Sequence, residues 1–318
     1  MWLAFILHAI GFVATLFAYD LATLFTATVF IGIGNGMVEA VCNPLVASMY
    51  PDKKTKMLNR FHIWFPGGIV IGSIIGYVLM DVLGLGWQFL VSTLFIPLAV
   101  YGFLFVGQAF PQTERVQMGV SARQSAMSLL TPLYLFVGFC MLLSAATELG
   151  TTQRIESLLS ATGVNALLVL AFINGIMMIG RAMAGSIANR ISTVGMLWFS
   201  AIFSFIGLQL LTMASGGFVF IAAAVFAVGV TFFWPTTLAL ISERLPESGA
   251  LGLSIMGGLG MLSVSFVLPI MGRILDNASG AEALRTMSIL PAILIVLYGG
   301  LFFVMRSRAG APAGSATH

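Results

Sequence analysis

Apolar stretches long enough to cross a membrane recur along the whole chain, and they restrict its fold more than any other feature. Ten such stretches lie at about 1–18, 22–49, 57–81, 87–108, 126–148, 162–187, 193–213, 217–242, 249–274 and 285–305. A helix of about 20 apolar residues spans the hydrocarbon core of a bilayer. Only 8% of the residues are charged and the mean hydropathy is +1.04, which excludes a water-soluble globular protein. We therefore expect an all-α polytopic membrane protein with ten transmembrane helices.

The distribution of basic residues predicts the orientation of these helices. If both termini are cytoplasmic, only Arg154, Arg273 and Arg285 of the 14 basic residues lie on the outer side, which leaves eleven inside. Cytoplasmic connections of membrane proteins carry an excess of Lys and Arg. We expect an integral protein of the plasma (inner) membrane with both termini in the cytoplasm. The net charge of +3 is explained by these connections, and it does not indicate nucleic-acid binding.

A polar connection after the fourth apolar stretch divides the chain into two unequal bundles. It contains Pro, Gln and charges of both signs, as inter-domain linkers commonly do. The predicted organisation is an incomplete N-terminal bundle of four spans at 1–108, a cytoplasmic linker at 109–125, a C-terminal six-helix bundle at 126–306 and a disordered cytoplasmic tail at 307–318.

Weak internal similarity supports this unequal division. Asn43-Pro44 and Trp234-Pro235 are 191 residues apart, and the glycine pairs beginning at Gly67 and Gly257 are 190 residues apart. Internal repeats are common in secondary transporters. On this register the spans at 126–148 and 162–187 have no counterparts in the first half. We therefore expect the N-terminal bundle to lack two spans.

Three motifs resemble the major facilitator superfamily, which has twelve helices in two six-helix bundles. The motifs are Gly34-Asn-Gly-Met-Val-Glu39-Ala-Val-Cys-Asn43-Pro44, followed by Leu58-Asn-Arg-Phe-His62; Gly180-Arg181-Ala-Met-Ala-Gly185-Ser-Ile-Ala-Asn189-Arg190; and Phe232-Phe-Trp234-Pro235-Thr236. Within the superfamily they look like the fucose/glucose/galactose–proton symporter branch. The resemblance implies alternating access between the bundles and a small-molecule solute moved together with a proton.

The sequence also departs from that branch. His62 and Phe65 stand where such sugar symporters tend to have Gln and Asn, which places a hexose substrate in doubt. Asn189 replaces the Asp that is usual in the loop motif. Ser73 follows Gly72 where drug antiporters carry Pro, and this difference favours symport.

Glu39 is the leading candidate for a functional residue. It lies deep in the second apolar stretch, and Asn43 follows one helical turn later on the same face. A charged group within the bilayer is costly, so an intramembrane acid indicates a functional site and favours an exchangeable proton. The resemblance also assigns this position to the substrate and the proton. The alternative is a fixed polar contact with a neighbouring helix.

Four further residues are candidates for a substrate or proton site. Glu148 precedes Gly150 and two threonines, a pattern that predicts a broken helix beside a cavity; the alternative is an interfacial pair with Arg154. His62 could relay a proton or bind a hydroxyl group, or it could be an interfacial structural residue. Trp234 could stack on a sugar ring or fill space at a proline kink. Asn174 is expected to form interhelical hydrogen bonds more readily than ligand contacts.

Arg181 and Arg190 are predicted to hold the cytoplasmic gate through carboxylates and helix ends. The sequence offers no cluster of metal ligands and no catalytic constellation, and its only histidines are His8, His62 and His318. We therefore expect no metal, no cofactor and no enzymatic activity.

The preferred hypothesis is a monomeric secondary active transporter that moves a small polar, sugar-like solute with a proton. Two alternatives stay open. One is efflux of drugs or metabolites, and the other is a membrane sensor or inactive truncated product that moves nothing.

Overall fold

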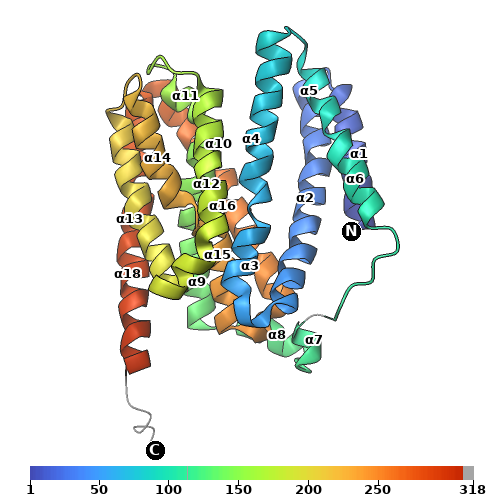
Figure 1. Cartoon of the computed structure of the whole chain (residues 1–318), viewed down its shortest axis with the longest axis vertical. Helices are drawn as coiled ribbons and strands as arrows, with labels where there is room; N and C mark the ends of the chain where they lie inside the picture. The colour runs from blue at the N-terminus through green and yellow to red at the C-terminus, as the bar shows by residue number, and fades with distance from the viewer. Residues whose placement is uncertain (113, 311–318) are drawn as a thin grey trace, which may run out of the picture.

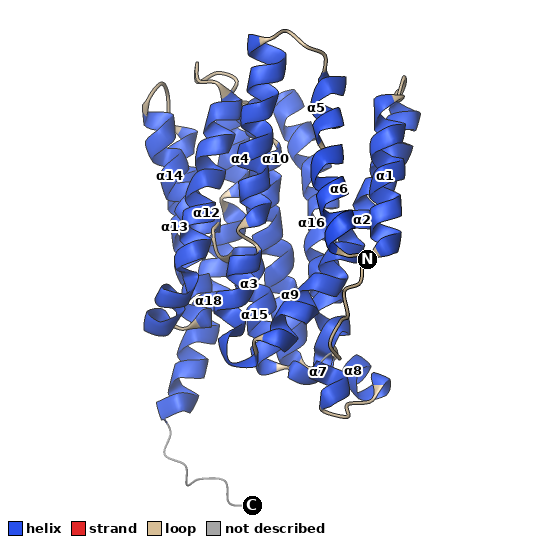
Figure 2. Ribbon diagram, turned by 45° about the vertical axis from the view of Figure 1, so that its right-hand side comes forward, coloured by secondary structure: helices blue, strands red, loops and turns tan. Residues whose placement is uncertain are grey.

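The computed structural model describes residues 1–112 and 114–310, and within them every regular element is a helix (Figures 1 and 2). Within these described ranges, nine helices are long and apolar enough to cross a membrane. The remaining predicted span, at about 1–18, corresponds to the shorter helix α1 (Trp2–Leu16), which has 15 residues. The all-α polytopic architecture is thus confirmed, with a count of ten that is approximate.

The N-terminal group of helices covers residues 2–104. Its elements are α1, α2 (Leu21–Met49), η1 (Pro51–Lys53), α3 (Lys54–Phe61), α4 (Trp64–Gly76), η2 (Tyr77–Val82), α5 (Trp87–Thr93) and α6 (Phe95–Leu104). The predicted span at 57–81 lies within one candidate membrane span, Pro51–Val82, in which a turn at His62 and Ile63 separates α3 from α4 and η2. In Figure 1 the helices α1, α2, α5 and α6 lie together on one side of the molecule.

The C-terminal group covers residues 132–310. Its elements are α9 (Pro132–Ala145), η3 (Ala146–Gly150), α10 (Thr151–Gln153), α11 (Ile155–Leu159), α12 (Ala166–Ile191), α13 (Thr193–Thr212), α14 (Phe218–Val230), α15 (Phe233–Arg244), η4 (Pro246–Ser248), α16 (Gly249–Asn277), α17 (Gly280–Met287) and α18 (Ile289–Gly310). The disordered tail was predicted to begin at 307, but helix α18 continues to Gly310, and the rest of that segment, 311–318, lies outside the described residues.

Two short helices, α7 (Glu114–Gln117) and α8 (Ala122–Ser128), belong to the connection between the groups. They lie at the lower end of Figure 1, which we call the linker end. The N-terminal group contacts the C-terminal group through three helices: α2 packs against α16, α3 against α12 and α15, and α4 against α12.

The buried core lies mainly in the C-terminal group. Apart from Ala47 and Leu58, all residues of the main buried apolar cluster fall between Tyr134 and Tyr298. Of the best apolar window in α2 only 11% is buried, against 67% for the span from Phe218 to Arg244. Side chains of the N-terminal group are therefore mostly exposed on the surface of the molecule, whereas the C-terminal group packs around a buried core.

Candidate functional site

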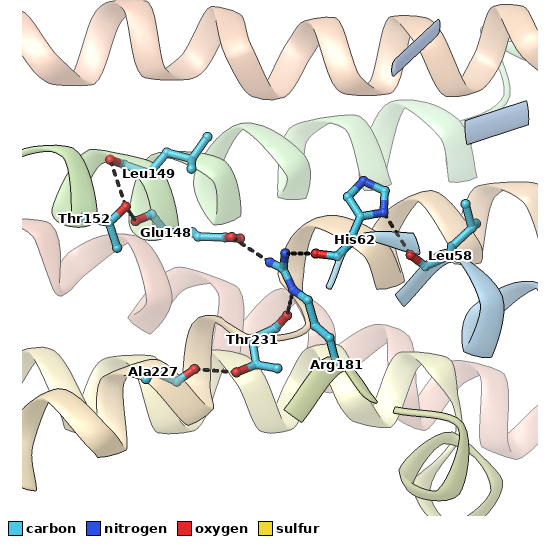
Figure 3. Close-up of polar contacts among 8 residues, drawn as sticks. All are labelled: Leu58, His62, Glu148, Leu149, Thr152, Arg181, Ala227 and Thr231. Atoms are coloured by element: carbon cyan, nitrogen blue, oxygen red, sulfur yellow. Dashed lines mark hydrogen bonds and ion pairs between the residues drawn. The ribbon is translucent and has the colours of Figure 1, made fainter. Parts of the chain in front are cut away.

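Arg181 is the centre of a buried polar network between the two groups of helices (Figure 3). The side chain is fully enclosed, and all three parts of its guanidinium donate hydrogen bonds. Nη2 contacts Glu148 Oε1 at 2.9 Å, Nη1 contacts the carbonyl of His62 at 3.0 Å, and Nε contacts the carbonyl of Thr231 at 2.8 Å. One side chain of α12 thus joins η3, the α14–α15 junction and the α3–α4 junction.

Two prolines explain why carbonyl groups are available to Arg181. In an α-helix the carbonyl of residue i accepts from the N–H of residue i+4, and proline has no N–H. His62 precedes Pro66 by four residues, and Thr231 precedes Pro235 by four. Each carbonyl therefore lacks its helical donor, and a buried carbonyl without a partner is costly. Arg181 satisfies one such oxygen from each group.

Glu148 lies in η3, where the helix widens to π geometry over Ala146–Gly150. This segment is the interruption that the glycine and threonines predicted. The Glu148 side chain is buried and pairs with Arg181, so the alternative pairing with Arg154 at the surface is not what the structure shows. Its second oxygen, Oε2, has no hydrogen-bond partner among the described residues.

A small cavity lies beside this network. Its volume is about 20 Å³, which is room for roughly one water molecule. The lining residues come from both groups: Glu39, His62 and Phe65 from the first, and Glu148, Leu149, Arg181, Trp234 and Met261 from the second. Residues that are far apart in the sequence therefore meet in one pocket of mixed polar and apolar lining at the interface of the two groups.

Several polar atoms of this lining have no partner among the described residues. They are His62 Nε2, Glu148 Oε2 and Trp234 Nε1. The carboxyl group of Glu39 likewise makes no hydrogen bond or ion pair with any described residue, although the residue is partly buried and lines the cavity. Buried polar groups are nearly always satisfied, so this concentration of unsatisfied atoms is typical of a ligand or water site.

The geometry at His62 fixes the polarity of its free nitrogen. Nδ1 lies 2.9 Å from the carbonyl of Leu58, and a carbonyl can only accept, so Nδ1 carries the proton. In a neutral imidazole, Nε2 is then an acceptor. The cavity therefore offers this lone pair to a donor such as a hydroxyl group, a water molecule or a protonated carboxyl group.

Glu39 approaches the C-terminal group where α16 has a glycine. A Cβ atom placed on Gly257 would lie 3.3 Å from Glu39 Oε2, so the absent side chain makes room for the carboxyl group. The adjacent residue Gly258 faces open space. A glycine at 257 thus allows an acidic side chain of α2 to rest against α16.

A second set of contacts joins the groups closer to the linker end. Glu243 of α15 accepts from the Thr55 hydroxyl at 2.5 Å and from the Thr193 hydroxyl at 3.0 Å. Asn59 Nδ2 donates to Thr236 Oγ1 at 3.1 Å. The bonds of Thr55 and Asn59 tie α3 to the C-terminal group below the small cavity, whereas the Thr193–Glu243 bond lies within the C-terminal group.

The structure brings together some of the predicted site residues and separates others. Glu39, His62, Glu148 and Trp234 line the same cavity, and Arg181, predicted as a gate residue, joins them. Three lie elsewhere. Asn43 is buried in α2 but does not line the cavity, Asn174 donates to Leu170 within its own helix, and Arg190 is exposed at the linker end.

Sequence reasoning missed the roles of Pro66 and of the Thr231 carbonyl. The available signal was the four-residue spacing from a proline to an upstream carbonyl in a helix, which identifies an oxygen needing an outside donor. It also missed a polar chain in the N-terminal group, in which His8 contacts Asn35 Oδ1 at 3.0 Å and Tyr101 Oη at 2.8 Å.

Comparisons with known proteins agree on the fold. A family model described as Major Facilitator Superfamily matches residues 1–250. Two crystal structures of FucP are similar: a single-residue variant of this E. coli fucose:proton symporter, with 16% identity and a TM-score of 0.72, and FucP in the outward conformation, with 17% identity and a TM-score of 0.73. Each match covers 93% of this chain, and 82% and 81% of the FucP chains respectively. No curated protein matches the sequence significantly.

Proposed function

The chain belongs to the major facilitator superfamily, a family of membrane transporters, and on that premise we propose that it is a proton-coupled carrier of a small polar, sugar-like solute. The observation that carries the proposal is the position of Glu39. This acid from the N-terminal group faces the Glu148–Arg181 pair of the C-terminal group across a cavity, and no described residue neutralises it.

Charge balance supports a proton at Glu39. The charges of Arg181 and Glu148 cancel in their ion pair, so an ionised Glu39 would be an uncompensated negative charge away from water. The neutral acid fits the closed cavity better, and opening to water allows it to release the proton. Binding and release of one proton per conformational cycle is what symport requires.

The unsatisfied atoms support an uncharged polyhydroxyl solute. Of these atoms, His62 Nε2 and Glu148 Oε2 are able to accept a hydrogen bond, and Trp234 Nε1 is able to donate one. Hydroxyl groups of a sugar donate and accept, and the rings of Trp234 and Phe65 offer apolar faces. One of the similar structures is of a fucose:proton symporter, and fucose belongs to this solute class.

The small cavity volume supports alternating access. About 20 Å³ holds no monosaccharide, so the two groups must separate before a solute can enter. The contacts of Thr55 with Glu243 and with Thr193 join the two groups near the linker end, and their release would allow the groups to separate there. We place the linker end and both termini in the cytoplasm, and the protein in the inner membrane.

Transport by vesicles from cells that express the chain tests the proposal. A panel of labelled monosaccharides including fucose is offered with and without an inward proton gradient, and solute counterflow is measured in parallel. We expect gradient-driven accumulation in the wild type. Glu39→Gln should lose accumulation but keep counterflow, because the neutral amide mimics the protonated acid.

The matched control is Glu156→Gln, which removes an exposed carboxylate outside the cavity. It should accumulate solute like the wild type. Equal accumulation by Glu39→Gln would refute the proton role. Outward pumping alone would indicate efflux, and a ligand-induced thermal shift without any flux would indicate a sensor.

A further inference from the structure

A second and much larger cavity opens at the linker end, away from the Glu39 site. Its volume is about 1090 Å³. Its walls come from η1 and α3 of the N-terminal group and from α12, α13, α15 and α18 of the C-terminal group. An occupant of this cavity would touch both groups of helices at once.

Basic side chains dominate the lining. Six line the cavity, namely Lys53, Lys54, Lys56, Arg190, Arg244 and Arg306, against the two acids Asp52 and Glu243. Six positive charges less two negative charges leave an excess of four. Glu243 is already engaged by the hydroxyl groups of Thr55 and Thr193. The cavity therefore carries a strong positive potential.

Most of these cations have no counterion. Five side chains make no hydrogen bond or ion pair with any residue that the structure describes: Lys53, Lys56, Arg190, Arg244 and Arg306. Like charges held around one cavity repel one another, and an anion between them removes that repulsion. Arginine also binds phosphate oxygens through paired N–H groups.

One wall of the cavity is apolar and continuous with the lipid-facing surface. Phe302 and Met305 of α18 line the cavity, while the intervening Phe303 and Val304 are 58% and 50% exposed on the same helix. Charged residues at the end of apolar helices lie at the depth of lipid headgroups. The cavity is thus lined by basic residues inside and by apolar residues at its outer edge.

We propose that this cavity binds a phosphate-bearing anion, and that its source is the headgroup of an anionic phospholipid whose acyl chains lie along α18. Basic pockets between helix ends on the cytoplasmic side suit such headgroups. The bound lipid would bridge α3 to α15 and α18. This inference concerns the linker-end cavity alone and does not depend on the transported solute.

The test measures lipid binding to the purified full chain in detergent, by native mass spectrometry and by the shift of the thermal unfolding midpoint. The probes are phosphatidylglycerol, phosphatidylcholine and inorganic phosphate. We expect phosphatidylglycerol to bind and stabilise, and phosphatidylcholine to do neither. The variant Arg244→Gln/Arg306→Gln should bind phosphatidylglycerol about 25-fold more weakly, at about fivefold for each basic residue.

The matched control is Arg60→Gln/Arg123→Gln, which removes two arginines at the linker end that do not line the cavity. It should retain binding, as should Arg244→Lys/Arg306→Lys, whose charge is unchanged. An equal loss in the control would show nonspecific attraction and overturn the site. Stabilisation by inorganic phosphate equal to that by phosphatidylglycerol would keep the anion site but overturn lipid as its source. Thermal unfolding midpoints measured without lipid identify any variant that is poorly folded. If the double variant is poorly folded, Arg306→Gln alone replaces it, and we expect it to bind phosphatidylglycerol about fivefold more weakly.

Discussion

Arg181 supplies the hydrogen bond that Pro66 cannot. The carbonyl of His62 lies four residues before Pro66, and Arg181 Nη1 reaches it at 3.0 Å from the other group of helices. The same arginine serves the carbonyl of Thr231, four residues before Pro235. Backbone groups left unpaired by proline in membrane helices are commonly satisfied by neighbouring helices. Here that neighbour is a charged residue that also holds an acid.

Pro66→Ala is expected to weaken the contact between the groups. Alanine restores an N–H at position 66, which competes with Arg181 for the His62 carbonyl. The alkylation rate of a cysteine placed at Leu149, with Cys42 and Cys140 replaced by alanine, reports opening of the cavity. We expect a severalfold faster rate. Pro44→Ala, which alters α2 away from Arg181, should leave the rate unchanged; an equal increase there would contradict the mechanism.

Removal of either member of the Arg181–Glu148 pair is expected to destabilise the protein. Arg181→Gln leaves a buried carboxylate without its cation, and the expected cost is about 3–5 kcal/mol in the free energy of unfolding. Arg181→Gln/Glu148→Gln removes both charges and should lose less than Arg181→Gln alone. Denaturant unfolding in detergent micelles measures both of these variants and the single variant Glu148→Gln. Additive losses would show that the pair is not coupled.

Gly257 and Gly258 form a natural matched pair. Gly257→Val places atoms against the Glu39 carboxyl group and should force it to move, whereas Gly258→Val points into open space. Both substitutions change helix propensity equally. We expect gradient-driven solute accumulation to be strongly reduced only by Gly257→Val. Comparable defects in both variants would indicate a general effect on α16.

His62→Asn and His62→Gln separate the two nitrogens of the imidazole. The asparagine amide can replace the Nδ1–H donor to Leu58 but does not reach the position of Nε2, which glutamine approaches better. We expect His62→Asn to keep a near-normal unfolding midpoint and to raise the KM for solute. Under the proposed function, an unchanged KM in His62→Asn would remove Nε2 from the binding site.

Thr55→Val is expected to loosen the linker end. The variant keeps the size of the side chain but deletes a hydrogen bond to the Glu243 carboxylate. Such bonds to charged groups contribute about 1.5–3 kcal/mol, which corresponds to a shift of roughly tenfold or more towards the open form. Maleimide labelling of a cysteine at Leu58, which is fully buried, should accelerate accordingly. Thr26→Val, whose hydroxyl bonds only within α2, is the control.

The sequence allowed prediction of the helices but only part of the site. The length of an apolar stretch is a local property of the sequence, so the spans could be predicted directly. The bounds differ by a few residues, as in the span predicted at 126–148 and observed at Pro132–Gln153. The meeting of Glu39 with Glu148 could not be read, because it depends on how two distant groups dock. Asn174 shows the limit clearly: an amide in an apolar helix fits an interhelical contact equally well, yet it bonds to Leu170 one turn away.

Glu39 was a candidate as an intramembrane acid, His62 for the chemistry of its imidazole and Trp234 mainly through resemblance, and the structure places all three on one cavity. Sequence patterns of side chains left out the backbone carbonyl groups that need a hydrogen-bond donor. Proline positions determine which carbonyls need donors, and this determines where an arginine can be buried. The motif of Arg181 predicted a role at the cytoplasmic gate. Its hydrogen bonds to the carbonyl of His62 and to Glu148 place it beside the cavity.

The uneven burial of the two halves has a consequence for biosynthesis. Helices α1 to α6 leave the ribosome first, and lipid offers them no hydrophobic incentive to associate. Their inward surfaces are completed by α12, α15 and α16, which are translated later. The early segments must therefore wait in the bilayer with polar side chains such as Glu39 incompletely covered. During that interval insertion factors and quality-control proteases have access to the nascent chain.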